Sequence, residues 1–262
     1  MEMLTVSVIV PNYNNEKYIA KCIDSILVQS YPIQKIVIYD DCSTDHSREI
    51  LKEYARLDSR IEVIYGEKNV GVSVARDIAI KATASDYVCM LDGDDYFYDF
   101  HKIENEMKKA QEIFDSTGRK VVVFSQTIDV DENGETLDNV KHVNLNGNER
   151  FKIVTRLYSR YMPRDYCFPR KLYDKCGGYT SGLSLYEDWD LNIKLLGETD
   201  FIYSGGYGTA YRHKCGGLSS VNYKKHLSTK IKIFKCHKTK LKEKLVFYSL
   251  AFAAYIKHLV RG

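Results

Sequence analysis

The chain has 262 residues, of which 44% are apolar and 28% are charged. This length and composition suit one large globular domain, or one domain with an appendage, and exclude a disordered chain. Its seven cysteines form no Cys-x-x-Cys pair, which argues against a disulfide framework and a zinc site and favours a reducing cytoplasm.

The net charge of +3 is unevenly distributed along the chain. Residues 224–262 hold eleven Lys and Arg but one acid, so they carry +10 and leave −7 for the preceding 223 residues. Within this basic segment, Leu245–Ile256 is a weakly polar run of twelve residues, too short for a membrane span of about 20. Two interpretations stay open: an amphipathic helix on a surface of anionic lipid, or a terminal helix packed on the core or on a second subunit.

Four short β-rich runs and three helical patterns alternate in the first hundred residues. The runs are Val6–Val10, Lys35–Tyr39, Ile61–Tyr65 and Tyr87–Leu91. Between them, apolar residues recur at helical spacing over residues 18–27, 45–54 and 73–82. Strands that alternate with helices of this length predict an α/β fold with a mostly parallel sheet and crossover connections.

Three of these predicted strands end in polar residues. Pro11–Asn14, Asp40–Asp45 and Asp92–Asp95 follow the first, second and fourth runs. Parallel sheets bind ligands outside the carboxyl ends of their strands, so we expect the three motifs to converge on one site.

The most acidic of these motifs, Asp92-Gly93-Asp94-Asp95, places three carboxylates directly after a buried strand. Such carboxylates repel one another unless a cation lies between them, and Mg²⁺ or Mn²⁺ supplies that cation while keeping positions open for phosphate oxygens. An exposed acidic turn is the alternative, since Asp and Gly are ordinary turn formers. The convergence of the three motifs favours a site for a metal and a nucleotide.

The second half of the chain is less regular. Asp129–Gly134 looks like the start of a calcium-binding loop, but Val140 stands where that loop needs Glu, so we predict a hairpin turn instead. The other elements predicted here are a strand at 121–127, helices at 148–160 and 187–196, and short strands at 201–203 and 209–211.

Five motifs in a fixed order carry a resemblance to a known family. They are Val8–Asn14, Asp40–Asp45, Asn69–Asp77, Leu91–Asp95 and Tyr186–Leu191. In this order they resemble the bacterial glycosyltransferases of family 2, over about residues 4 to 220. The resemblance implies a GT-A fold, Rossmann-like and flanked by helices, that binds a nucleotide-sugar, most often a UDP-sugar, together with Mn²⁺ or Mg²⁺, and transfers the sugar with inversion.

The resemblance also implies a division of the chain. Residues 1–220 would form the catalytic domain, with 1–127 binding the nucleotide-sugar and 128–220 holding the acceptor and the base. Beyond the resemblance, the charge and apolar pattern predicts that residues 221–262 form a basic amphipathic helical tail. The nucleotide-sugar site implied by the resemblance consists of Pro11, Tyr13, Asp40, Asp41, Arg76, Asp92 and Gly93.

Within that site, the resemblance implies that Tyr13 stacks on the base, Asp41 accepts its imide N–H and Asp92 holds the ribose hydroxyls. Asp94, Asp95 or both would bind the metal. His213 falls where many relatives carry a histidine or arginine near the diphosphate, and it would complete the metal shell; Arg212 and Lys214 are alternatives that would neutralise phosphate.

The resemblance makes Asp188 the catalytic base, with Glu187 as an acceptor-binding or pKa-tuning partner. A carboxylate there takes the proton of the acceptor hydroxyl as its oxygen attacks the anomeric carbon. The alternative is that Glu187 and Asp188 only complement a helix dipole. Asp77 departs from the family pattern, which usually has Asn there, and its charge makes a nucleotide role of Arg76 less certain.

The motifs also exclude other enzymes. The first strand is followed by Pro-Asn-Tyr-Asn and not by the glycine-rich turn of a dehydrogenase, and no Gly-x-x-x-x-Gly-Lys-Ser/Thr of a kinase is present. We therefore expect a metal-dependent hexosyl- or N-acetylhexosaminyltransferase of cell-surface polysaccharide synthesis. It would act on a glycan or lipid-linked acceptor, in the cytoplasm or on the inner face of the membrane, without nucleic acid and as a monomer or homodimer. A catalytically silent binding subunit of a glycan assembly complex is the alternative.

Overall fold

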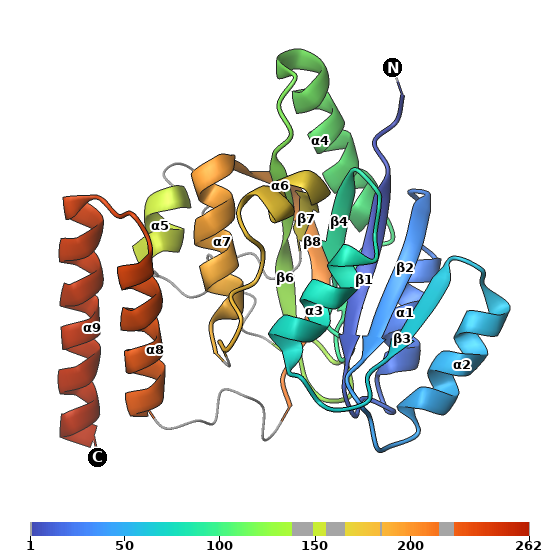
Figure 1. The fold of residues 1–262 in the computed structure, drawn as a ribbon, viewed down its shortest axis with the longest axis horizontal. Coiled ribbons are helices and arrows are strands. Elements are labelled where there is room, and N and C mark those ends of the chain that lie inside the picture. Colours follow the sequence, from blue (N-terminus) through green and yellow to red (C-terminus); the bar gives the residue numbers. More distant parts are fainter. Residues whose placement is uncertain (1, 138–148, 156–165, 184, 215–222, 262) are drawn as a thin grey trace.

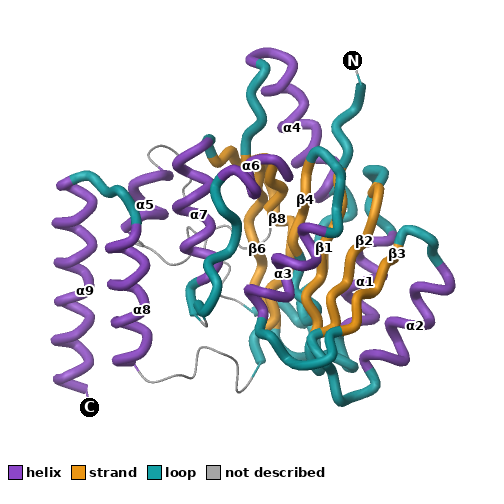
Figure 2. Tube along the Cα trace, viewed as in Figure 1, coloured by secondary structure: helices purple, strands orange, loops and turns teal. Residues whose placement is uncertain are grey.

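The computed structural model describes residues 2–137, 149–155, 166–183, 185–214 and 223–261. Within them, one eight-stranded sheet runs through the molecule in the order β3-β2-β1-β4-β7-β6-β8-β5 (Figure 1). Helices lie on both faces of this sheet (Figure 2). The predicted α/β fold is confirmed.

The first half of the chain forms the parallel part of the sheet, as predicted. β1 pairs in parallel with both β2 and β4, and β2 pairs in parallel with β3. β1, β2 and β4 are largely buried, which explains their long apolar runs in the sequence, whereas β3 at the edge of the sheet buries only Ile61 fully. The elements of this half are β1 (Val6–Asn12), α1 (Ile19–Leu27), β2 (Ile33–Asp40), α2 (Ser47–Leu57), β3 (Ile61–Tyr65), α3 (Val72–Lys81) and β4 (Tyr87–Met90).

Successive residues of each strand enter two different cores, because side chains alternate across a sheet. On β1, Val8 and Val10 pack with α1 and α4 (Lys102–Thr117), whereas Ile9 packs in the core that includes α3 and α7 (Glu187–Glu198). The sheet is therefore buried on both faces.

The second half adds strands of mixed direction. β7 (Tyr166–Pro169) is antiparallel to β4 and β6 (Val122–Val130), and β5 (Tyr96–Phe97) is antiparallel to β8. The two short strands predicted at 201–203 and 209–211 are one strand, β8 (Phe201–Arg212). The prediction split it because Gly205 and Gly206 interrupt the apolar pattern; in the structure both adopt positive φ, and the pairing with β6 shifts register nearby.

The predicted hairpin turn at Asp129–Gly134 is confirmed. The N–H of Leu137 donates to the Asp129 carbonyl at 2.9 Å, and the N–H of Asp131 donates to the Glu135 carbonyl at 2.9 Å. Gly134 has φ +91°, a conformation that Gly adopts without strain.

In Figure 1, the helices of the second half gather on the side of the sheet away from β3. The predicted helix at 148–160 is described as α5 (Glu149–Thr155), while Asn148 and 156–160 lie outside the described residues. The predicted helix at 187–196 is α7. The remaining helices are α6 (Arg170–Lys175), α8 (Tyr223–Cys236) and α9 (Leu241–Arg261).

The basic tail packs partly on the core. Ile233 and Phe234 of α8 and Phe247 of α9 are buried in the same core as α7. Trp189 of α7 stacks on Phe247 with ring centroids 6.0 Å apart. Among the described helices, none is both long and apolar enough to cross a membrane.

Candidate functional site

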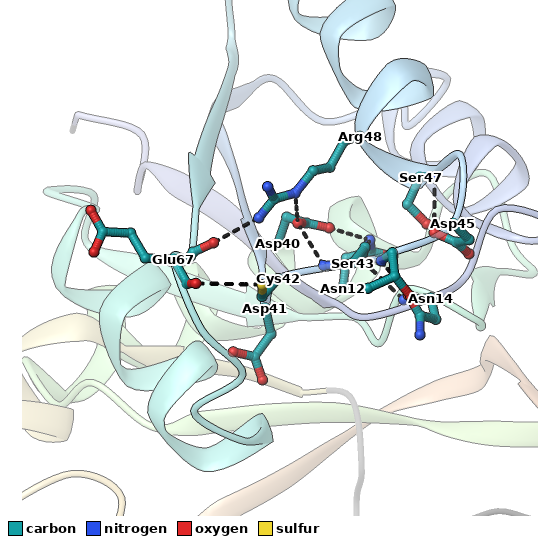
Figure 3. Close-up of polar contacts among 12 residues, drawn as sticks. Asn12, Asn14, Asp40, Asp41, Cys42, Ser43, Asp45, Ser47, Arg48 and Glu67 are labelled. Carbon is teal, nitrogen blue, oxygen red and sulfur yellow. Dashed lines mark hydrogen bonds and ion pairs between the residues drawn. The ribbon is translucent and has the colours of Figure 1, made fainter.

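Asp40, the last residue of β2, is fully buried in a hydrogen-bond network (Figure 3). One of its carboxylate oxygens accepts the Arg48 Nε–H at 2.7 Å and the Ser43 N–H at 3.1 Å, and the other accepts the Asn12 amide at 3.0 Å. Because both oxygens already have donors, Asp40 joins the ends of β1 and β2 to the start of α2.

The neighbouring carboxylate, Asp41, points away from that network (Figure 3). Its two oxygens accept the backbone N–H groups of Val70 at 2.7 Å and Gly71 at 2.9 Å. Gly71 precedes α3 and has φ +86°, and Cys42 has φ +64°. Asp41 thus fixes the turn into α3 and stays 4% exposed at the edge of the sheet.

The loops after β1 and β2 are bonded to one another. The N–H of Thr44 donates to the Asn14 side chain at 2.8 Å, and the N–H of Asn15 donates to the Ser47 hydroxyl at 3.1 Å. Asn14 has φ +52°, which Asn tolerates better than most residues. Tyr13 remains 46% exposed on this rigid loop pair, so its ring is available to a ligand.

Gly93 lies where the loops after β1 and β4 approach most closely. A Cβ at this position would come within 3.1 Å of the Pro11 carbonyl and 3.0 Å of the Asn12 side chain. The approach brings buried Pro11 beside the acidic motif after β4. The predicted convergence of the three motifs at one edge of the sheet is therefore observed.

The three carboxylates of the acidic motif have different partners. Asp92 binds the Arg76 guanidinium at 2.6 Å, and Asp94 binds the Lys214 ammonium at 2.6 Å. Asp95 is buried and accepts the backbone N–H of Arg212 at 2.8 Å. The carboxylates of Asp92 and Asp94 stay partly exposed, with side-chain exposures of 38% and 26%.

Arg76 joins two motifs that lie far apart in the sequence. Besides Asp92, its guanidinium binds Glu187 at 2.9 Å, 111 residues away. The Asp77 carboxylate accepts the Tyr173 hydroxyl at 2.7 Å and pairs with Lys81 at 2.7 Å. The contacts of Asp77 therefore leave the guanidinium of Arg76 to Asp92 and Glu187.

Glu187 and Asp188 open α7 at the edge of this site. Burial raises the pKa of Glu187, and the charge of Asp188 adds to the rise, while Arg76 opposes it. Tyr186, immediately before them, has φ +63°, a strained conformation for an aromatic residue that is common at functional sites. Asp188 itself is half-buried and accepts the N–H of Trp189 at 2.7 Å.

A small cavity opens among these residues, between the end of β4 and β8. Two atoms of its lining residues, Arg76 Nε and Thr209 Oγ1, are buried and have no hydrogen-bond partner within the described part of the chain. Buried polar atoms normally have a partner, so this cavity of about 20 Å³ fits one water or one small group of a ligand. Its lining is Arg76, Met90, Leu91, Asp92, Asp95, Thr127, Thr209 and Tyr211.

His213 lies on the same side of the molecule but has other contacts. Its Nε2 lies 3.1 Å from the Asp129 carboxylate, and its ring packs edge-on against Tyr211. No contact with Asp92, Asp94 or Asp95 is found for its ring among the described residues. Its place in a metal shell stays a prediction.

The carboxylates at this edge of the sheet fit a divalent cation that is also coordinated by phosphate oxygens of a substrate. Asp94 already attracts a cation, Lys214, and Mg²⁺ typically takes one or two carboxylates plus substrate oxygens. Among the described residues, three potential ligands gather only at Cys89, Glu106 and Cys167 in the core. The Lys102 ammonium, 2.9 Å from the Cys89 sulfur and 3.1 Å from Glu106, already supplies the cation there.

Several residues that organise the site are not among those predicted from the sequence. Arg48 neutralises Asp40, and Ser43 and Asn12 complete its bonding. The side-chain oxygen of Asn15 accepts a hydrogen bond from the Lys214 ammonium at 2.9 Å. The density of Asn and Ser in the first two motifs is the one signal in the sequence that points to such bonding, because these side chains bond to loops and turns.

Comparisons with known proteins extend the resemblance. The family model described as "Glycosyl transferase family 2" matches residues 7–181. An uncharacterized glycosyltransferase of Haemophilus influenzae is 27% identical over 267 residues, covering 98% of this chain and 99% of that protein. The putative teichuronic acid biosynthesis glycosyltransferase TuaG of Bacillus subtilis is 48% identical over 90 residues, which are 34% of this chain and 36% of TuaG. The alignment with TuaG thus spans about a third of that protein.

Solved structures with a similar fold include two of S. aureus TarS, residues 1–349. The complex with UDP superposes with a TM-score of 0.66 at 20% identity, and the complex with UDP-GlcNAc with a TM-score of 0.66 at 22% identity. Each superposition covers 93% of this chain and 70% of TarS 1–349. The predicted GT-A fold, with helices at its C-terminal end, is confirmed.

Proposed function

Because this chain belongs to glycosyl transferase family 2, and is thus a glycosyltransferase, we propose that it moves a hexose or N-acetylhexosamine from a UDP-sugar to an acceptor hydroxyl with inversion. The acceptor is a glycan or a lipid-linked saccharide of cell-surface polysaccharide synthesis. The enzyme acts in the cytoplasm, on the inner face of the cell membrane. The name of TuaG supports a role in polysaccharide synthesis, and the TarS complexes with UDP and UDP-GlcNAc support a UDP-sugar as the donor.

The single observation that carries this proposal is the Arg76 bridge. Its guanidinium forms two ion pairs, one with Asp92 after β4 at 2.6 Å and one with Glu187 at the start of α7 at 2.9 Å. The bridge keeps the proposed base, Asp188, at a fixed place relative to the proposed ribose ligand, Asp92. Placing the reacting groups in this way is a main source of rate enhancement in enzymes.

Tyr13 and Asp41 hold the base of the nucleotide. The exposed Tyr13 ring offers a stacking surface beside buried Pro11. Each carboxylate oxygen of Asp41 accepts one backbone N–H and retains a lone pair for the imide N–H of uracil. Asp40 shapes this pocket without touching the ligand, because its oxygens are buried and bonded to protein donors.

Asp94 is the carboxylate that holds Mn²⁺ or Mg²⁺. Asp95 is a poorer candidate because it is buried and accepts a main-chain N–H. A bound cation would neutralise the charge of the diphosphate leaving group. Three cationic side chains already lie at this edge: Arg76 and Lys214 bind the carboxylates of Asp92 and Asp94, and the Arg212 guanidinium donates to the Asp94 carbonyl at 2.9 Å.

Asp188 acts as general base. It takes the proton of the acceptor hydroxyl while that oxygen attacks the anomeric carbon from the face opposite the nucleotide. Glu187 is held by Arg76 and remains an acceptor-binding partner. Burial raises the pKa of Glu187, while the Arg76 guanidinium 2.9 Å away opposes the rise and fixes the carboxylate beside Asp188.

Two experiments test the proposal. The first is a thermal-shift panel of UDP, GDP, CMP and ADP, each with and without Mn²⁺; a ligand at a hundredfold its Kd stabilises by about 2.7 kcal/mol. We expect a shift with UDP that requires metal. No shift with any nucleotide would overturn the donor assignment.

The second experiment measures UDP-sugar hydrolysis and transfer by Asp188→Asn. Loss of a general base slows the reaction by about 10²- to 10⁴-fold. Asp200→Asn is the matched control, since Asp200 is an exposed carboxylate paired with Arg119. Unchanged turnover in Asp188→Asn would reject it as the base, and nucleotide binding without any turnover in the wild type would favour the silent binding subunit.

A further inference from the structure

Helix α9 has an apolar face that the rest of the described chain does not cover. Its inner side is held by buried Phe247 and buried Glu243. Its opposite side carries exposed apolar residues at helical spacing, with Leu245 63% and Phe252 66% exposed. We call this face the outer stripe; it consists of Leu241, Leu245, Tyr248, Phe252, Tyr255 and Ile256, of which Tyr248 also packs edge-on against Phe234 of α8.

The segment that carries the outer stripe is strongly basic, and Lys242 and Lys244 lie on α9 itself. Glu243 is the only acid in residues 224–262, and its carboxylate is buried, accepting the Lys240 N–H at 2.7 Å. The lysines of this hairpin, by contrast, are mostly exposed. Of the ten lysines in α8, α9 and the segment between them, all but the half-buried Lys230 are exposed: Lys224, Lys225, Lys232, Lys235, Lys238, Lys240, Lys242, Lys244 and Lys257.

Charge decides which partner this surface suits. A two-fold dimer would place the same face of both copies together and would bring two lysine-rich surfaces into contact without an exposed acid between them. An anionic bilayer provides the opposite charge and an apolar layer beneath it. Tyr248 and Tyr255 have the mixed polar and apolar character of residues that lie at a membrane interface.

We propose that the outer stripe of α9 lies in the headgroup region of an anionic lipid bilayer, with the helix axis parallel to the surface. The flanking lysines contact the lipid phosphates, and Leu245, Phe252 and Ile256 reach the acyl boundary. Figure 1 shows α9 at the edge of the molecule, where a flat surface can approach it. This inference rests on the membrane location in the proposed function, but it does not require sugar transfer.

The docked helix is joined directly to the helix that carries the proposed base. Phe247, on the inner side of α9, stacks on Trp189. His237, between α8 and α9, lies 2.8 Å from the Asp190 carboxylate, and His226 of α8 lies 2.8 Å from the Tyr186 hydroxyl. Lipid binding through α9 therefore holds α7 at a set distance from the bilayer, where a lipid-linked acceptor would be presented.

The test is flotation of the full chain with two kinds of vesicle, phosphatidylcholine alone and an equal mixture of phosphatidylcholine and phosphatidylglycerol. We expect the wild type to float with the anionic vesicles only. Leu245→Gln/Phe252→Gln and, separately, Lys242→Glu/Lys244→Glu should each weaken binding by at least about tenfold.

The matched control is Val28→Gln/Leu57→Gln, which changes two exposed apolar residues, one just after α1 and one at the end of α2, and should bind like the wild type. The fluorescence of Trp189, the only tryptophan, reports whether each variant keeps the α7–α9 contact. The proposal is overturned if the wild type binds neither vesicle, binds both equally, or binds as well after the outer stripe is changed. A wild-type dimer that Leu245→Gln/Phe252→Gln converts to a monomer would assign the stripe to a second copy instead.

Discussion

Asp40 and Asp41 after β2 and Asp92 to Asp95 after β4 are acidic motifs of similar sequence in very different surroundings. The first pair is buried, and its oxygens accept backbone N–H groups, an amide and Arg48. In the second motif, Asp92 and Asp94 are partly exposed and bind the side chains of Arg76 and Lys214. Asp40, which is fully buried and has protein donors on both oxygens, supports the fold, whereas a carboxylate paired with a long cationic side chain can change partners when a ligand arrives.

Within these two motifs, the largest effect should come from Asp94→Ala. If this carboxylate holds the metal, transfer should fall by about 10²- to 10³-fold, equivalent to about 3–4 kcal/mol. The free energy of unfolding should change by less than about 1 kcal/mol, because the ion pair with Lys214 is partly exposed. Steady-state kinetics and thermal unfolding measure the two effects, with Asp200→Ala as the control. A variant that keeps its activity would place the metal elsewhere, with Asp95 tested next.

Asp40→Ala should have the opposite profile. It removes a fully buried carboxylate that accepts hydrogen bonds from Arg48, Ser43 and Asn12, which should cost about 3 kcal/mol of stability. For a chain of this size the melting temperature should fall by about 6–12 °C. Urea unfolding checks the free energy. If stability is unchanged while UDP binding disappears, Asp40 contacts the nucleotide directly and our distinction between the two motifs fails.

Asp190 extends the comparison to the side of α7 that faces the tail. Although burial raises its pKa, hydrogen bonds from His237, Thr180 and Lys194 outweigh that effect and lower the pKa of Asp190 to about 2. A depressed carboxylate pKa stabilises the fold above the unfolded value of about 4 and loses that contribution as the pH falls through about 2. The expected loss is about 2–3 kcal/mol.

The measurement is urea unfolding of the wild type and Asp190→Asn from neutral pH to about pH 2. The stability difference between them should be greatest near neutral pH and should shrink over the acidic window. A difference that does not depend on pH would mean that the variant lost packing and not charge.

The parallel half of the fold could be predicted from the sequence because its strands are continuous apolar runs that end in polar motifs. The elements that were not predicted, such as β5 and α4, lacked such a signal. β5 has two residues, and α4 buries Lys102 and Glu106 on its inner side, which interrupts the apolar periodicity of that helix. Buried charges of this kind are stable only because they pair with one another, and a sequence does not display the pairing.

The site was predictable to a similar extent. The alternation of strands and helices placed three motifs at one edge, and the structure places them there. It could not indicate that Asp40 is enclosed while Asp94 faces a lysine, since both are Asp in a loop. The sequence also could not predict the ion pair between Glu187 and Arg76, because that contact depends on how the irregular second half packs against α3.

The smallest effect tests whether the partners of the second motif are exchangeable. The Lys214 ammonium contacts Asp94 at 2.6 Å and Asn15 at 2.9 Å, so a metal that binds Asp94 has to displace it. A partly exposed ion pair contributes up to about 1 kcal/mol, so Lys214→Met should raise the affinity for Mn²⁺ alone by up to about fivefold. Lys81→Met is the control, because Lys81 pairs with Asp77 away from this motif. Mn²⁺ titration followed by electron paramagnetic resonance measures the affinity without nucleotide. Unchanged or weaker binding would mean that Lys214 and the metal do not compete, and Asp94 would then be as fixed by its partner as Asp40 is by Arg48.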